Sequence, residues 1–159
     1  MFDAKTYAAR RDLLRKNVKD GLILLPGNGE SAMNYPANPY PFRQDSTFLY
    51  FFGIDKPDFA GVIDVDENKD YIFGTDFTID DIIWMGPQPS VKELAAAVGV
   101  QHTGAPAEMK EMIDKAAAAG RTIHFLPPYR AETQVQLAGL LNISNEQAKQ
   151  DFSDRKSVV

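Results

Sequence analysis

Leu22-Ile23-Leu24-Leu25 is a continuous apolar run enclosed by Gly21 and Pro26. A short run without polar alternation is typical of a strand that is covered on both faces of a sheet. The residues before it predict a helix that begins at the N-cap Asp3 and stops at Gly21. A helix followed by a buried strand favours an α/β domain.

The chain that follows this run predicts further strands and a short helix. Thr47 to Phe52 holds four aromatic residues in six positions, which favours a strand. Ala60 to Val65 and Tyr71 to Phe73 flank a polar turn, so residues 60–74 predict a hairpin. A short helix is expected near Asp80.

The second half predicts helices that alternate with one late strand. Ser90 and Glu93 form a capping-box pattern before a helix that ends at Gly99. The other expected elements are helices over Pro106–Ala119 and Arg130–Leu141, a strand over Arg121–Leu126 and a cap at Ser144 and Gln147. The pattern therefore predicts a mixed sheet with helices on both faces.

The expected core combines residues of these strands. Its members are Leu22, Leu24, Phe48, Tyr50, Phe52, Val62, Ile72, Phe73, Ile123 and Phe125.

Length and composition exclude several classes of protein. The chain has 159 residues, 44% of them apolar and 25% charged, which is ordinary for one globular domain. No apolar run is long enough for a membrane helix, and the first residues lack the apolar centre of a signal peptide. Cysteine is absent, which fits a reducing compartment such as the cytoplasm. Seventeen basic residues against 22 acidic ones give a net charge of −5, which argues against nucleic-acid binding.

Few residues suggest a metal site. The two histidines, His102 and His124, lie far apart in sequence, His102 in an expected turn and His124 in an expected strand. Asp64 and Asp66 are two residues apart and share a strand face, so they are candidates for holding hard cations in a nuclease. The alternative, which we favour, is that they belong to a hairpin turn, where Asp is common. The sequence therefore predicts no metal site.

Other catalytic patterns are incomplete. The loop Pro26-Gly27-Asn28-Gly29 follows a strand as a phosphate loop does, but it lacks the Gly-Lys-Ser/Thr ending and the third glycine. No Gly-x-Ser-x-Gly nucleophile motif is present. The residues alone therefore define no catalytic set.

Two segments stand out from this ordinary background. Tyr40-Pro41-Phe42-Arg43-Gln44-Asp45-Ser46 places large and charged side chains directly before the aromatic stretch. Trp84 is the only tryptophan and precedes the Gly86-Pro87 loop. Trp84 is either a core anchor or a residue that contacts a ligand, since tryptophan suits both positions.

These two segments resemble the N-terminal domain of Xaa-Pro aminopeptidases (aminopeptidase P). The string Tyr40 to Ser46, followed by Phe48, Tyr50 and Gly53, resembles the family, as does Ile83-Trp84-Met85-Gly86 further on. Leu49, where relatives often have tryptophan, and Thr47 depart from the pattern. The resemblance is close over most of residues 7–102 and loose beyond them.

The resemblance implies a ribonuclease-H-like α/β/α fold and a domain over residues 1–150. Residues 151–159 would then begin the connection to a catalytic domain that this chain lacks. In the family that domain holds two metal ions, usually manganese, and hydrolyses the Xaa-Pro bond of a peptide. The chain by itself is expected to be inactive, to assist formation of a homodimer or homotetramer, and to wall the active-site cleft of a cytoplasmic hydrolase.

The resemblance also suggests roles for single residues. Trp84 is expected to contact substrate, because its flat ring packs well on a proline ring. Arg43 is expected to tie the carbonyls of its proline-rich loop, with capture of a substrate carboxylate as the alternative. A stand-alone binding or oligomerisation module with the same fold remains an alternative for the whole chain.

Overall fold

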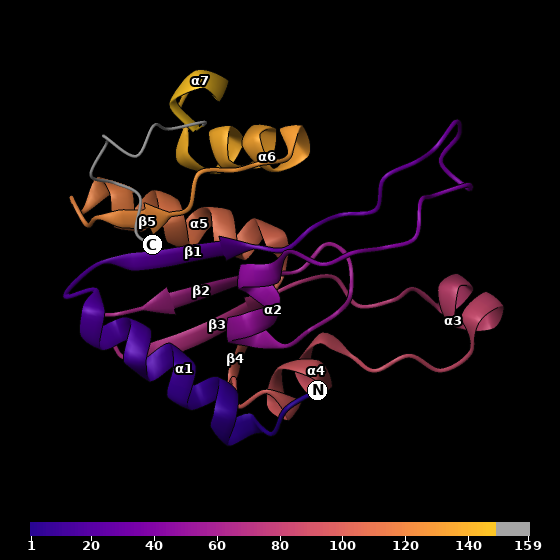
Figure 1. The fold of residues 1–159 in the computed structure, drawn as a ribbon, viewed down its shortest axis with the longest axis horizontal. Helices are drawn as coiled ribbons and strands as arrows, with labels where there is room; N and C mark the ends of the chain where they lie inside the picture. The colour runs from indigo at the N-terminus through magenta and orange to yellow at the C-terminus, as the bar shows by residue number, and fades with distance from the viewer. Residues whose placement is uncertain (149–159) are drawn as a thin grey trace.

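A computed structural model of the chain describes residues 1–148. Its centre is a five-stranded mixed sheet with the order β4-β3-β2-β1-β5 (Figure 1). The strands are β1 (Leu22–Pro26), β2 (Ala60–Asp64), β3 (Lys69–Phe73), β4 (His102–Gly104) and β5 (Ile123–Phe125). β1 pairs antiparallel with β2 and parallel with β5, so the apolar run Leu22–Leu25 forms an interior strand.

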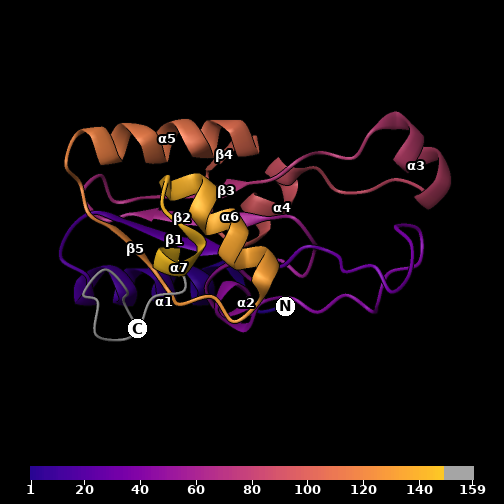
Figure 2. The same cartoon turned by 90° about the horizontal axis from the view of Figure 1, so that it is seen from above.

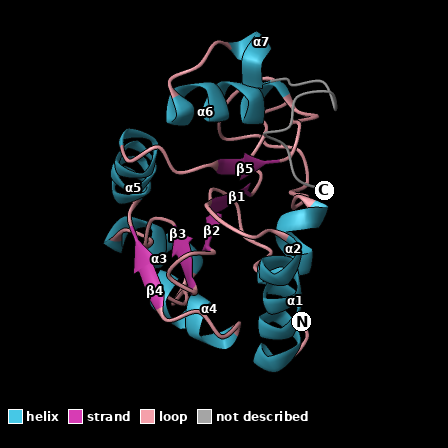
Figure 3. Ribbon diagram, turned by 90° about the vertical axis from the view of Figure 1, so that its left-hand side faces the viewer, coloured by secondary structure: helices cyan, strands magenta, loops and turns pink. Residues whose placement is uncertain are grey.

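Helices lie on both faces of the sheet (Figures 1 and 3). The helices are α1 (Ala4–Asn17), α2 (Ser46–Phe52), α3 (Ile79–Met85), α4 (Val91–Ala97), α5 (Pro106–Ala118), α6 (Ala131–Leu141) and α7 (Asn145–Ala148). Residues of α1, α2 and α4 join one apolar cluster, and residues of α5, α6 and α7 join another. The α/β fold with a mixed sheet is therefore confirmed. None of the helices within residues 1–148 has the length and apolar character needed to cross a bilayer.

β1 contributes side chains to both clusters, because alternate residues of a strand point to opposite faces of the sheet. Ile23 and Leu25 face the cluster with α1, whereas Leu22 and Leu24 face the cluster with α5. All four are buried, which explains why the run has no polar residue.

The aromatic stretch is a helix, so the predicted strand over Thr47–Phe52 is wrong. The Asp45 carboxylate caps α2 by accepting a hydrogen bond from the Phe48 amide at 2.8 Å. Phe48 and Phe52, four residues apart, are fully buried with ring centroids 5.4 Å apart. Gly53 ends the helix with a φ of 65°, and a side chain there would collide with the Tyr7 ring.

Other expectations had mixed outcomes. The 60–74 hairpin, the helix near Asp80, the Ser90–Glu93 capping box and the later helices are confirmed. Tyr50 is not in the core, because the helix turns it outward and leaves it 51% exposed. Ile123 is only partly buried, on the edge strand β5. His102 begins β4 instead of lying in a turn.

Arg121, which precedes β5, binds the end of β2 and the turn that follows it. Its guanidinium donates to Asp64 at 2.6 Å and to Asp66 at 2.8 and 3.0 Å. These bonds to Arg121 hold the pKa of Asp66 below 3.8. The two carboxylates considered as cation ligands therefore neutralise an arginine.

Truncation of Leu24 tests the central position of β1. Leu24→Ala should lower the free energy of unfolding by about 2–5 kcal/mol, because the fully buried side chain leaves a cavity between β1 and α5. Urea denaturation measures the change. The exposed Leu13 of α1 provides the control, since Leu13→Ala should change stability by less than about 0.5 kcal/mol. Equal effects of the two substitutions would contradict the placement of β1.

The Asp66–Arg121 pair predicts a loss of stability in acid. The folded-state pKa of Asp66 is lowered, so its contribution is present above the unfolded pKa and is lost as the pH falls through the folded value, below 3.8. The free energy of unfolding of Asp66→Asn should therefore fall less steeply than that of the wild type at low pH. Asp55→Asn, at an exposed acid, should keep the wild-type slope. A wild-type slope in Asp66→Asn would refute the linkage.

Candidate functional site

The candidate site lies where the parallel strands β1 and β5 end. From β1 the chain continues to α2 on one face of the sheet, and from β5 it continues to α6 on the other face. Such a divergence at the carboxyl ends of neighbouring strands opens a crevice in α/β folds. An open cleft of about 630 Å³ occupies this position.

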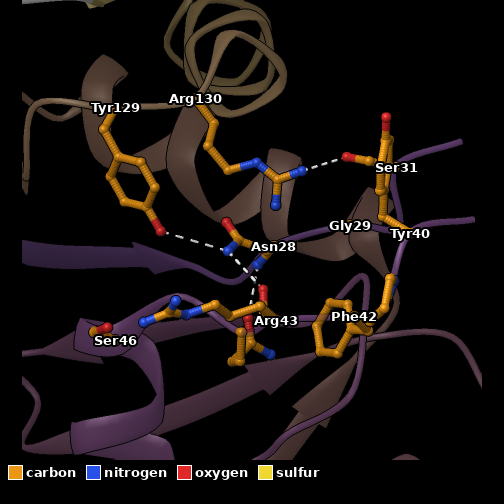
Figure 4. A pocket seen from close by; sticks show the side chains of 11 residues that line it. Asn28, Gly29, Ser31, Tyr40, Phe42, Arg43, Ser46, Tyr129 and Arg130 are labelled. Carbon is orange, nitrogen blue, oxygen red and sulfur yellow. Dashed lines mark hydrogen bonds between the residues drawn. The ribbon is translucent and has the colours of Figure 1, made fainter. Parts of the chain in front are cut away.

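Three segments line the cleft, two from the connection between β1 and α2 and one about 85 residues further along the chain (Figure 4). They are the loop after β1, the segment that enters α2 and the segment after β5. The lining residues are Asn28, Gly29, Ser31, Tyr40, Pro41, Phe42, Arg43, Gln44, Ser46, Tyr129 and Arg130. Six of the seven residues of the Tyr40–Ser46 string therefore face one cavity, and Asp45 is the exception.

Gln44 holds this region together. It is buried, and its side-chain oxygen accepts hydrogen bonds from the amides of Asn28 at 2.8 Å and Asp45 at 2.9 Å. Its side-chain nitrogen donates to the carbonyls of Ile54 at 3.0 Å and Lys56 at 2.8 Å. One amide thus fixes the loop after β1 to both ends of α2.

Arg43 does not have the role that the sequence suggested. Its side chain is exposed, and within the described part of the chain its guanidinium donates no hydrogen bond to a carbonyl of the loop. The buried Gln44 side chain points inward and instead ties two carbonyls of the segment after α2, those of Ile54 and Lys56. The carbonyl of Arg43 accepts a hydrogen bond from the Asn28 side chain at 2.9 Å.

The far side of the cleft is formed by Tyr129 and Arg130. In Figure 4 they stand across Asn28 from Arg43. The Tyr129 hydroxyl lies 3.5 Å from the Asn28 side-chain nitrogen, and the Arg130 guanidinium donates to the Ser31 hydroxyl at 2.5 Å. No sequence pattern indicated this pair, although Pro127-Pro128 marks the end of the strand before it.

Trp84 lies apart from the cleft. It belongs to α3, which projects with the loop 30–42 from the same end of the molecule (Figures 1 and 2). Its side chain is 88% exposed, so the core-anchor alternative is wrong. Thr78 and Asp81 cap the helix reciprocally, which gives this exposed segment a defined start.

The described residues, 1–148, do not form a metal centre. Within residues 1–148, no group of three or more His, Asp or Glu side chains is placed to hold a metal ion. Asp64 and Asp66 pair with Arg121, as described above, and the His124 ring bonds the Asp20 carbonyl at 2.9 Å. The chemistry available in the cleft is therefore that of arginine, amide, hydroxyl and aromatic groups.

Two curated proteins are similar to this chain in sequence. A probable Xaa-Pro aminopeptidase of Penicillium rubens is 30% identical over 110 residues, which cover 65% of this chain and 22% of the relative. Another from Emericella nidulans is 34% identical over 92 residues, covering 58% of this chain and 19% of the relative. The chain thus spans about a fifth of the length of these relatives.

Solved structures share the fold. Aminopeptidase P of E. coli in its low-pH form matches with a TM-score of 0.72 at 21% identity, over 89% of this chain and 33% of that one. Proline aminopeptidase P II of Yersinia pestis matches with a TM-score of 0.73 at 19% identity, over the same shares. A family model described as the aminopeptidase P N-terminal domain matches residues 7–124. The chain therefore belongs to the family of aminopeptidase P N-terminal domains.

Proposed function

We propose that this chain is the non-catalytic N-terminal domain of a proline-specific metallopeptidase, either a Xaa-Pro aminopeptidase or a dipeptidase. In this proposal residues 1–150 form the domain, and residues 151–159, which lie outside the described residues, begin the connection to the catalytic domain. The family assignment and the small share of each relative that the chain spans support the proposal.

The observation that carries the proposed role is the exposed apolar face of α3. Ile79, Ile83 and Trp84 are 77%, 71% and 88% exposed, and none of the residues of this helix is buried. Contiguous apolar side chains on a projecting element are typical of surfaces that contact another protein or a ligand. We assign this face to the wall of the active-site cleft, in its own subunit or in a neighbouring subunit of a homodimer or homotetramer.

The two metal ions, which we expect to be manganese, belong in this proposal to the catalytic domain. Within residues 1–148 no acids are grouped to hold them, and the two that the sequence suggested, Asp64 and Asp66, already neutralise Arg121. A peptide bond before proline would be hydrolysed in the cytoplasm by that domain, while this one positions and encloses the substrate.

A stand-alone binding or oligomerisation module is the second candidate. The same exposed face on α3 would serve it equally well. The reading frame after the codon for Val159 distinguishes the two: a continuing frame that encodes Asp, His and Glu metal ligands supports the domain, and a stop codon supports the module.

Trp84→Ala tests the cleft-wall role. In the 159-residue chain it should change the free energy of unfolding by less than about 0.5 kcal/mol, because the ring is almost fully exposed. In the full-length enzyme it should lower kcat/KM for a Xaa-Pro peptide by about ten- to thirty-fold, since a stacked ring is lost. Val135→Ala, at an exposed apolar residue of α6, is the control and should leave kcat/KM unchanged. An unchanged kcat/KM for Trp84→Ala would remove Trp84 from the cleft.

The isolated chain should neither bind manganese tightly nor hydrolyse a Xaa-Pro peptide. The reason is the lack of a clustered ligand set within residues 1–148. Calorimetric titration with Mn²⁺ and an assay with a Xaa-Pro dipeptide and tripeptide measure both. One-to-one binding at about 1 μM together with turnover would place the catalytic centre in this chain.

A further inference from the structure

The cleft at the ends of β1 and β5 has a charge opposite to that of the whole chain. The chain carries a net charge of −5, yet among residues 1–148 the cleft is lined by two arginines and by no Asp or Glu. A positive pocket on an acidic protein attracts anions to that one place, because the walls of a cleft focus the local field.

The two arginines retain unused donors. The side chain of Arg130 is 23% exposed, and its one hydrogen bond within residues 1–148 goes to the neutral Ser31 hydroxyl at 2.5 Å. Its nearest carboxylate, on the largely exposed Glu132, lies 3.7 Å away. A guanidinium has five N–H donors, so Arg130 can be held by Ser31 and still bind a second group. Arg43 is exposed and pairs with no carboxylate within the described residues.

Aromatic and apolar groups complete the lining. Tyr40, which is 55% exposed, and Phe42 line one side of the cleft, and Tyr129, which is 74% exposed, lines the other. Exposed rings next to arginines suit a flat or apolar group that carries a negative charge. The volume of about 630 Å³ is that of a small-molecule site.

We propose that this cleft binds a small organic anion, with the guanidinium groups of Arg43 and Arg130 on its carboxylate or phosphate group and the rings of Tyr40, Phe42 and Tyr129 against its body. Both oxyanions match the planar fork of arginine, so the chemistry is shared by a carboxylate and a phosphate ester. Gln44 fixes the geometry by holding the Asn28 loop and the start of α2 in place. The proposal stands independently of the peptidase assignment.

An NMR titration of the 159-residue chain tests the site with defined probes. Hippurate supplies a carboxylate on a flat body, phenyl phosphate supplies a phosphate, and hippuramide is the neutral counterpart of hippurate. At least one anionic probe should bind with a dissociation constant of about 1 mM or tighter and shift the backbone amides of Asn28, Gly29, Ser46 and Arg130. The anion with the lower dissociation constant shows whether the cleft prefers a carboxylate or a phosphate.

Two variants assign the binding to the arginines. Arg43→Gln and Arg130→Gln should each weaken the better probe by about tenfold or more, because a charge-assisted hydrogen bond is lost. Arg43→Gln is the cleaner test of the two, since the native Arg43 side chain is exposed and holds no loop carbonyl. Lys92→Gln removes an exposed charge on α4 and should keep the wild-type affinity.

Three results would overturn the proposal. They are the failure of both anions to shift the cleft amides, equal binding of hippuramide and hippurate, and wild-type affinity in both arginine variants.

Discussion

The buried guanidinium of Arg11 is the constraint on which one whole layer depends. It is fully buried, and it pairs with Asp70 of β3 at 2.7 Å while donating to the carbonyls of Phe51 at 2.8 Å and Val98 at 2.9 Å. One side chain of α1 thus joins the sheet, the last turn of α2 and the end of α4. A buried charge is tolerated only when it is paired and hydrogen-bonded, so these three elements hold their positions together.

Gln44 likewise joins separate segments, here with a neutral amide group beside the cleft. Its four hydrogen bonds to backbone groups show that residues of the Tyr40–Ser46 string have different roles. Gln44 and Asp45 build the loop and the helix cap, which leaves Arg43 directed to solvent. Loss of the Gln44 side chain would leave these buried backbone groups without hydrogen bonds, which costs more free energy than the hydrogen bonds themselves contribute. The string is therefore a structural motif that presents one arginine.

Local signals in the sequence predicted most of the fold, and long-range packing accounts for the rest. The apolar run of β1, the hairpin and the capping boxes follow from patterns within about ten residues. α2 was mistaken for a strand because its aromatic residues have high strand propensity, whereas the burial of Phe48 against Phe52 imposes helical spacing. β4 was missed because it is three residues long and exists only through its pairing with β3. The burial of Arg11 follows from no local pattern, because its partner Asp70 is 59 residues away in the sequence.

The site was the least predictable feature, because it depends on the pairing of β1 with β5, about a hundred residues away. That pairing brings Arg130 to the same cleft as Asn28 and Arg43. The result is one end of the molecule with two different surfaces, since α3 projects from this end with apolar residues exposed, while the cleft offers arginine and aromatic groups (Figures 1 and 2). An apolar face gains free energy by excluding water over a broad contact, whereas a charged cleft gains it from a few directed hydrogen bonds. The two surfaces therefore suit the different occupants that we propose for them, a protein or peptide on α3 and a small anion in the cleft.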